Sequence, residues 1–212
     1  MSEGRPDAVF LGPDSYRFVR FLEAELPICA DRLIDMGTGA GVGAICAARK
    51  LAGAALVLVD ANPEALRLAQ INAQVAGLAV HAIAADRLDA VSGEIQLLVA
   101  NPPFIMDRKG LTYRDGGDML GAALSRDWAL AAAERLRPGG RVLLYTGSAI
   151  VDGRDALREA LEAGLAPLGC TMRYCEIDPD IFGEQLSSEG YEQVERIAAV
   201  GAVITRVPIL SP

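Results

Sequence analysis

The sequence is poor in residues that bind metals and lacks the long apolar runs that cross membranes. Its 212 residues include one histidine, His81, and four cysteines with neither a CxxC pair nor zinc spacing, so we predict no bound metal. No apolar run reaches the roughly 20 residues that span a bilayer. The first residues lack the basic segment and apolar core of a secretion signal. Isolated cysteines are typical of a reducing compartment, so we expect a cytoplasmic protein with no membrane partner.

Positive charge is also scarce. The 28 acidic residues outnumber the 20 lysines and arginines, which gives a net charge of −8 at pH 7. Proteins that hold a nucleic-acid duplex usually present a basic face, because phosphate contacts supply most of their non-specific affinity. The charge therefore favours a protein or a small-molecule partner. A nucleic-acid partner is possible through a local basic patch, but the net charge does not favour it.

Aromatic residues make up only 5% of the chain, whereas 51% is apolar, as expected if alanine-rich helices cover a buried sheet. Strands that are apolar on both faces and alternate with helices predict an α/β fold with a doubly wound, mostly parallel sheet. No full crossover helix separates the last two strands, so we expect an antiparallel edge pair. The predicted strands are 32–36, 55–59, 79–84, 95–100, 141–145, 170–177 and 202–207, and the predicted helices are 15–26, 42–50, 63–76, 119–136, 155–165 and a short one near 191–198.

The length suits a single domain, which we place at residues 29–212, after an N-terminal helical segment over residues 1–28. The pattern in helix 63–76 predicts a buried stripe of Ala65, Leu68, Ile71 and Val75. Trp128 and the aromatic residues of helix 15–26 are interpreted as core. The segment 178–198 has no assigned role, and we interpret the acids Glu176, Asp178, Asp180 and Glu184 as a solvated rim. Tyr113 and Arg114 are interpreted as a solvated loop pair, and the alternative is that they orient the substrate.

A glycine-rich loop, Asp35-Met36-Gly37-Thr38-Gly39-Ala40-Gly41, follows the first predicted strand and opens a helix. Asp60 ends the next strand, where a carboxylate can accept both hydroxyls of a ribose. The same glycines also satisfy the dinucleotide pattern G-x-G-x-x-G/A, so the motif alone leaves a nicotinamide cofactor open. Asp35 instead favours a nucleoside cofactor that carries a methionine group. A carboxylate at this place repels a pyrophosphate, and it suits the ammonium of the methionine. It can also cap the N–H groups of the loop.

The tetrapeptide Asn101-Pro102-Pro103-Phe104 follows the apolar strand 95–100. It brings together an amide side chain, a backbone carbonyl directed by a proline, and an aromatic face. These groups suit a planar NH2 substrate whose two hydrogens are held while its nitrogen attacks an electrophile. The alternative is an ordinary turn after a strand. Asp86, after the third predicted strand, suits an adenine amino group as well as it suits a turn or helix cap.

With these motifs in this order, the chain resembles the class I methyltransferases that carry an NPP[F/Y] motif. That group includes release-factor glutamine N5-methyltransferases and N6-adenine and N2-guanine methyltransferases. Asp115-Gly116-Gly117 and Pro138-Gly139-Gly140 also look like the release-factor branch. The resemblance implies a Rossmann-like seven-stranded sheet of order 3-2-1-4-5-7-6 and S-adenosylmethionine as cofactor. The implied cofactor-binding residues are Asp35, Gly37, Thr38, Gly39, Gly41, Asp60, Ala61, Asp86 and Asn101, and the implied catalytic residues are Asn101, Pro102, Pro103 and Phe104.

The segment 178–198 is longer than this fold needs, and we expect no separate substrate-recognition domain before residue 28. Two other functions compete with the methyltransferase. An NAD(P)-dependent oxidoreductase would leave the Asn-Pro-Pro-Phe motif unused and needs a catalytic Tyr/Lys or His/Asp arrangement that we do not find. A non-catalytic S-adenosylmethionine-binding module predicts a damaged motif, and this one is intact. The acceptor is left open between a protein glutamine, a ring amine of a nucleic acid, and a small-molecule amine.

Overall fold

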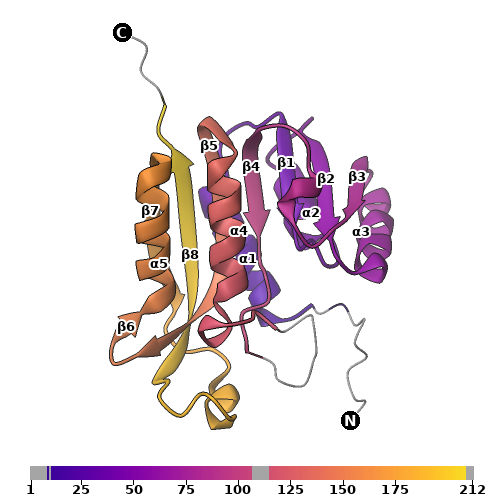
Figure 1. Cartoon of the computed structure of the whole chain (residues 1–212). Coiled ribbons are helices and arrows are strands. Elements are labelled where there is room, and N and C mark those ends of the chain that lie inside the picture. Colours follow the sequence, from indigo (N-terminus) through magenta and orange to yellow (C-terminus); the bar gives the residue numbers. More distant parts are fainter. Residues whose placement is uncertain (1–8, 10, 107–114, 209–212) are drawn as a thin grey trace.

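A computed structural model describes residues 9, 11–106 and 115–208, and it contains one mixed sheet with helices on both faces (Figure 1). The strand order is β3-β2-β1-β4-β5-β8-β7, and a short β6 pairs with β5 off this path. Apart from β6, this is the predicted order. The strands are β1 (Arg32–Met36), β2 (Ala55–Asp60), β3 (Val80–Ala84), β4 (Ile95–Ala100), β5 (Leu136–Val151), β6 (Arg154–Asp155), β7 (Cys170–Asp178) and β8 (Arg196–Arg206).

Two apolar clusters, one on each face of the sheet, form the core. Alanines of α4 and leucines of α5 pack on one face, and these two helices stand in front of the sheet in Figure 1. Residues of α1, α2 and α3 pack on the other face. Strands β1 to β5 run parallel, and β8 pairs antiparallel with both β5 and β7. The helices are α1 (Pro13–Glu25), α2 (Val42–Ala48), α3 (Pro63–Val75), α4 (Ala123–Glu134) and α5 (Ala156–Leu165).

Helix α3 begins as predicted but buries a different face. Asn62 caps it, because its side chain accepts a hydrogen bond of 3.0 Å from the N–H of Glu64, and proline suits the first helical position. Of the predicted stripe only Ala65 is buried, whereas Ile71 and Val75 are exposed, Val75 by 85%. The small side chains let α3 approach the sheet and α2 closely. The alanines therefore form most of the buried face, and the larger Ile71 and Val75 point to solvent. The buried residues are Ala65, Leu66, Ala69 and Ala73.

The second half of the sheet departs most from the prediction. Strand β5 extends six residues beyond the predicted end at Tyr145, and α4 ends before the predicted Leu136. The short helix predicted near 191–198 is wrong, since β8 already begins at Arg196. The pairing of β5 with β8 runs from Arg141 opposite Thr205 to Ile150 opposite Arg196. Two neighbouring strands therefore overcome the helical preference of Ala198 and Ala199.

The parallel order places the carboxyl ends of β1, β2, β3 and β4 at one edge of the sheet. Ligands of open α/β sheets bind at this edge, next to the point where the strand order reverses. Here that point lies between β1 and β4. Within residues 9, 11–106 and 115–208, no helix has the length and apolar character needed to cross a bilayer.

Candidate active site

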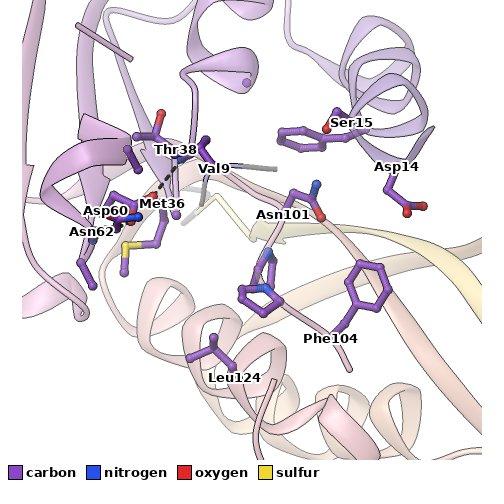
Figure 2. A pocket seen from close by; sticks show the side chains of 18 of the residues that line it. Val9, Asp14, Ser15, Met36, Thr38, Asp60, Asn62, Asn101, Phe104 and Leu124 are labelled. Atoms are coloured by element: carbon purple, nitrogen blue, oxygen red, sulfur yellow. Dashed lines mark hydrogen bonds between the residues drawn. The ribbon is translucent and has the colours of Figure 1, made fainter. Parts of the chain in front are cut away.

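A cavity of about 950 Å³ opens at the carboxyl ends of these strands (Figure 2). Eleven of the twelve predicted cofactor and catalytic residues line it, namely Asp35, Gly37, Thr38, Gly39, Asp60, Ala61, Asp86 and the four residues of the Asn-Pro-Pro-Phe motif. Gly41 is the exception. It is the N-cap of α2 with φ at +85°, and a Cβ there would lie 3.2 Å from that of Ala69. Its role is to let α2 and α3 meet closely.

Asp35 lies under the glycine loop at the end of β1 and is 2% exposed. Its Oδ2 accepts hydrogen bonds of 2.8 Å from the Thr38 hydroxyl and from the backbone N–H of Ala44. Burial raises the pKa of Asp35 to about 6, although these two hydrogen bonds oppose the rise. Gly43 makes room for the carboxylate, since a Cβ there would lie 2.8 Å from Oδ1. Asp35 therefore caps the loop and also faces the cavity.

The N–H groups of the glycine loop are largely occupied. Those of Gly37 and Thr38 donate to the carbonyl of Val59, and that of Gly41 donates to Thr38. The N–H of Gly39 donates to Asp60 Oδ2 at 2.8 Å. A pyrophosphate needs such groups free, so this loop is a poor dinucleotide site. The hydrogen bonds instead give the loop a fixed shape against β2.

Asp60 ends β2 and lies next to the N-terminus of α3. Its Oδ1 accepts a hydrogen bond of 2.9 Å from the N–H of Asn62, in addition to the bond from Gly39. Each carboxylate oxygen can accept a further bond, so Asp60 can hold the loop and receive ribose hydroxyls at the same time. Asp86 follows β3 and is exposed at the same cavity. These positions fit S-adenosylmethionine, with Asp35 toward an ammonium, Asp60 toward a ribose and Asp86 toward an adenine.

The Asn-Pro-Pro-Phe motif follows β4 directly, and three glycines lie against it, two at the backbone and one at the ring of Phe104. A Cβ at Gly116 would lie 2.7 Å from the carbonyl oxygen of Pro103, and one at Gly121 would lie 2.7 Å from the carbonyl carbon of Ile105. The ring of Phe104 is buried and packs over Gly147 of β5. Its second neighbour is Phe182, in an edge-to-face pair with ring centroids 5.7 Å apart. Tyr113 and Arg114 lie outside the described residues.

Several residues of the cavity wall were not predicted. Trp128 was interpreted as core, and its ring does pack there, but it also lines the cavity beside Gly37. Phe182 and Glu184 come from the segment between β7 and β8, and both line the cavity. Glu184 is exposed, as predicted for the solvated rim, but it also belongs to the cavity wall. Leu124 also lines the cavity, and its place one helical turn before Trp128 was a sequence signal that one face of this helix meets the cavity. Asp14, Ser15 and Phe18 of α1 also line the cavity.

Fold and site together define a class I, S-adenosylmethionine-dependent methyltransferase. The sheet order, the acid at the end of β2 and the Asn-Pro-Pro-Phe motif after β4 each belong to that class. The chain is a member of the methyltransferase small domain family, which it matches over residues 14–163.

Similar proteins agree with this assignment. The chain is 32% identical over 164 residues to a release factor glutamine methyltransferase of Deinococcus radiodurans, covering 73% of this chain and 55% of that protein. It is 44% identical over 89 residues to a ribosomal protein L11 methyltransferase of Bordetella parapertussis, covering 42% and 28%. The chain thus spans about half the length, or less, of these curated relatives. The fold resembles a solved Thermus thermophilus 16S rRNA N2 G1207 methyltransferase in complex with AdoMet and guanosine, with a TM-score of 0.61, 19% identity, and coverage of 94% of this chain and 44% of that one.

Proposed function

We propose that this chain methylates a planar NH2 nitrogen, and that the preferred acceptor is the side-chain amide of a glutamine in a polypeptide. The observation that carries the proposal is the position of Asn101-Pro102-Pro103-Phe104, at the wall of the cavity that also contains Asp35 and Asp60. The glutamine is favoured by the relatives named as release factor glutamine methyltransferases and by the net charge of −8.

The mechanism follows from the weakness of the nucleophile. An amide nitrogen has a delocalised lone pair and attacks poorly. In the proposed complex, the side-chain oxygen of Asn101 and the backbone oxygen of Pro102 each accept one hydrogen of the NH2 group. This draws electron density to the nitrogen and directs its lone pair. Bound S-adenosylmethionine supplies a methyl group activated by its positive sulfur.

The remaining residues of the motif orient the acceptor. Pro103 has no N–H, so no donor competes with the two carbonyls for the substrate. Phe104 is held by Gly147 and Phe182 and keeps the wall beside the acceptor apolar. Correct orientation of an attacking nitrogen supplies much of the rate in a reaction of this kind. No general base is required, because the methylated nitrogen is acidic and gives up its proton readily.

Labelled S-adenosylmethionine tests the acceptor directly. The chain is incubated with labelled cofactor and a fractionated cell extract, and label is measured in protein, nucleic acid and small molecules. We expect label in protein, released as N5-methylglutamine after digestion. Label on carbon, oxygen or sulfur, or none in any fraction, would refute the NH2 acceptor.

A titration separates the methyltransferase from the oxidoreductase alternative. Calorimetry with S-adenosylhomocysteine should show binding, and calorimetry with NAD should show none, because the amides that a pyrophosphate needs are occupied. Tight binding of NAD would overturn the assignment of the cofactor.

A further inference from the structure

The cavity has two sides that differ in origin. Asp60 and Asn62 lie on one side of Asn101, whereas Asp14 and Phe104 lie on the other (Figure 2). The first side contains the residues that fit the cofactor, so the second side faces the acceptor in the proposed reaction. Two features of the acceptor side have no role in that reaction so far, namely the carboxylates of Asp14 and Glu184.

Asp14 is a buried carboxylate directed at the cavity. It is 6% exposed, and its Oδ1 accepts a hydrogen bond of 2.8 Å from the hydroxyl of Tyr145. Burial, together with the charge of Asp14, raises the pKa of Tyr145 well above its ordinary value, so the phenol stays protonated and donates. Tyr145 itself is fully buried in β5 and holds Asp14 in place.

The second oxygen of Asp14 remains available. Among the described residues no group bonds to Oδ2, and no fully buried side-chain oxygen there lacks a partner, so Oδ2 retains accessible surface, and Asp14 lines the cavity. Arg17 neutralises Asp14 only in part. It lies 3.5 Å from Oδ1 but only 2.6 Å from Asp178, its closer partner. A mostly buried carboxylate with one oxygen still open is a strong acceptor for a charged donor that enters the cavity.

Glu184 is brought to the same side by the segment between β7 and β8. Asp178 is tied to Arg17 of α1, and the N–H of Ile181 donates to the carbonyl of Ile197 at 2.7 Å. At the other end of the segment the hydroxyl of Tyr191, 1% exposed, accepts from the N–H of Met106 at 2.8 Å. The segment is therefore anchored to α1, to β8 and to the chain that follows the Asn-Pro-Pro-Phe motif.

The described part of the cavity wall carries charge of one sign. The wall within residues 9, 11–106 and 115–208 includes no lysine, arginine or histidine, while six carboxylates line it, namely Asp14, Asp35, Asp60, Asp86, Asp115 and Glu184. Asp35 and Asp60 already have partners in the glycine loop. Asp14 and Glu184 would repel a phosphate and attract a cation next to the reacting amide.

We infer that Asp14 and Glu184 select an acceptor polypeptide that carries a positively charged side chain beside the reactive glutamine. This inference rests on the proposed function and adds the neighbour that the acceptor must have. Asp14 binds the cationic group through Oδ2, and Glu184 attracts it at the mouth of the cavity. Phe182 completes the wall between them through its contact with Phe104.

Two matched peptides test the inference. Acetyl-Lys-Gln-Gly-amide and acetyl-Glu-Gln-Gly-amide are titrated into the full chain saturated with S-adenosylhomocysteine, at low and at high salt. We expect the lysine peptide to bind at least about tenfold more tightly, since a like charge beside a desolvated carboxylate is strongly unfavourable. The preference should shrink as salt screens the charges.

Asp14→Asn and Glu184→Gln should each reduce the preference, and the double variant should abolish it. Asn at position 14 can still accept the Tyr145 hydrogen bond, and unchanged affinity for S-adenosylhomocysteine verifies the fold. Glu94→Gln is the matched control, because Glu94 is exposed just before β4, at the end of the strand away from the cavity, and it should keep the full preference.

Four results would each overturn the inference. The two peptides could bind equally, the glutamate peptide could bind more tightly, neither peptide could bind, or the preference could survive in the double variant. So would an RNA that competes with the lysine peptide. These results leave the proposed function standing as long as label from S-adenosylmethionine still reaches an NH2 group. Absence of any such transfer is the separate result that refutes the proposed function.

Discussion

The contact between Phe104 and Gly147 gives a direct test of the catalytic motif. In Gly147→Ala, the added Cβ would lie 2.7 Å from Cε2 and 2.9 Å from Cγ of the Phe104 ring, and closer still to Cδ2. Ordinary contacts between carbons lie at about 3.5–4.0 Å, so the ring must retreat by about 1 Å. It has little room, because it is 8% exposed and lies against Phe182.

Overpacking of this kind costs about 1–3 kcal/mol of folding free energy. A displacement of about 1 Å in a catalytic loop can lower turnover by about 10²-fold. We therefore expect Gly147→Ala to lower both the midpoint of thermal unfolding and kcat, measured as label transfer to the acceptor. The Kd of S-adenosylhomocysteine should not change, because the residues that fit the cofactor lie on the other side of Asn101.

Gly201→Ala is the matched control for this prediction. Gly201 pairs with Tyr145 in the sheet, and a Cβ there would lie 2.6 Å and 2.8 Å from the ring of Phe21. The clash again joins a strand glycine to a phenylalanine ring, but Phe21 belongs to α1 and does not line the cavity. Gly201→Ala should lose stability and keep kcat per folded molecule. The reasoning is refuted if Gly147→Ala keeps its turnover, or if the two variants lose turnover equally.

Three further predictions concern the motif and the two buried or half-buried acids. Asn101→Ala should leave calorimetric binding of S-adenosylhomocysteine intact and lower kcat by roughly 10²–10³, the loss seen when one preorganised hydrogen-bonding group is removed from a transition state; near-normal kcat would mean that the motif is only a turn. Asp60→Ala should weaken binding of S-adenosylhomocysteine by about 1.5–3 kcal/mol, and an unchanged Kd would limit Asp60 to holding Gly39 and Asn62. Burial raises the pKa of Asp35 to about 6 in the free protein, so below that pH its carboxyl is protonated and cannot pair with an ammonium. The affinity for S-adenosylhomocysteine should therefore fall as the pH drops below 6, by up to about tenfold for each pH unit. A Kd that stays constant from pH 5 to pH 7 would show that Asp35 serves only as a cap.

The sequence was sufficient to predict which short stretches of chain meet at the cavity. The glycine loop, Asp60 and Asn101 were predicted because each follows an apolar strand, and parallel strands bring their carboxyl ends to one edge. The order of the sheet was implied by the resemblance to methyltransferases with an NPP[F/Y] motif, and the alternation of strands and helices predicted only that the sheet is mostly parallel and covered on both faces. The structure shows the cap that was predicted for Asp35, and it adds the same double use for Asp60: both carboxylates accept hydrogen bonds from backbone N–H groups and also line the cavity.

The sequence was insufficient where distant segments decide the outcome. Residues 196–198 look helical in isolation, and only pairing with β5 makes them part of a strand. Asp14 and Glu184 are 170 positions apart, and no local pattern shows that α1 and the segment after β7 line one cavity. Trp128 was assigned to the core by its type, but its position on α4 also turns it toward Gly37.

The two sides of the cavity also differ in how the chain supplies them. The groups that fit the cofactor come from one continuous stretch, from Asp35 to Asp86, whereas the acceptor side combines α1 with a segment that follows β7. During synthesis the last part of the described cavity wall to emerge is the segment between β7 and β8, and its Ile181 is hydrogen-bonded to Ile197 of β8, which is made later still. Over evolutionary time, insertions between β7 and β8 can therefore change the acceptor without disturbing the methyl donor's site, so relatives with the same glycine loop can diverge in the molecules they modify.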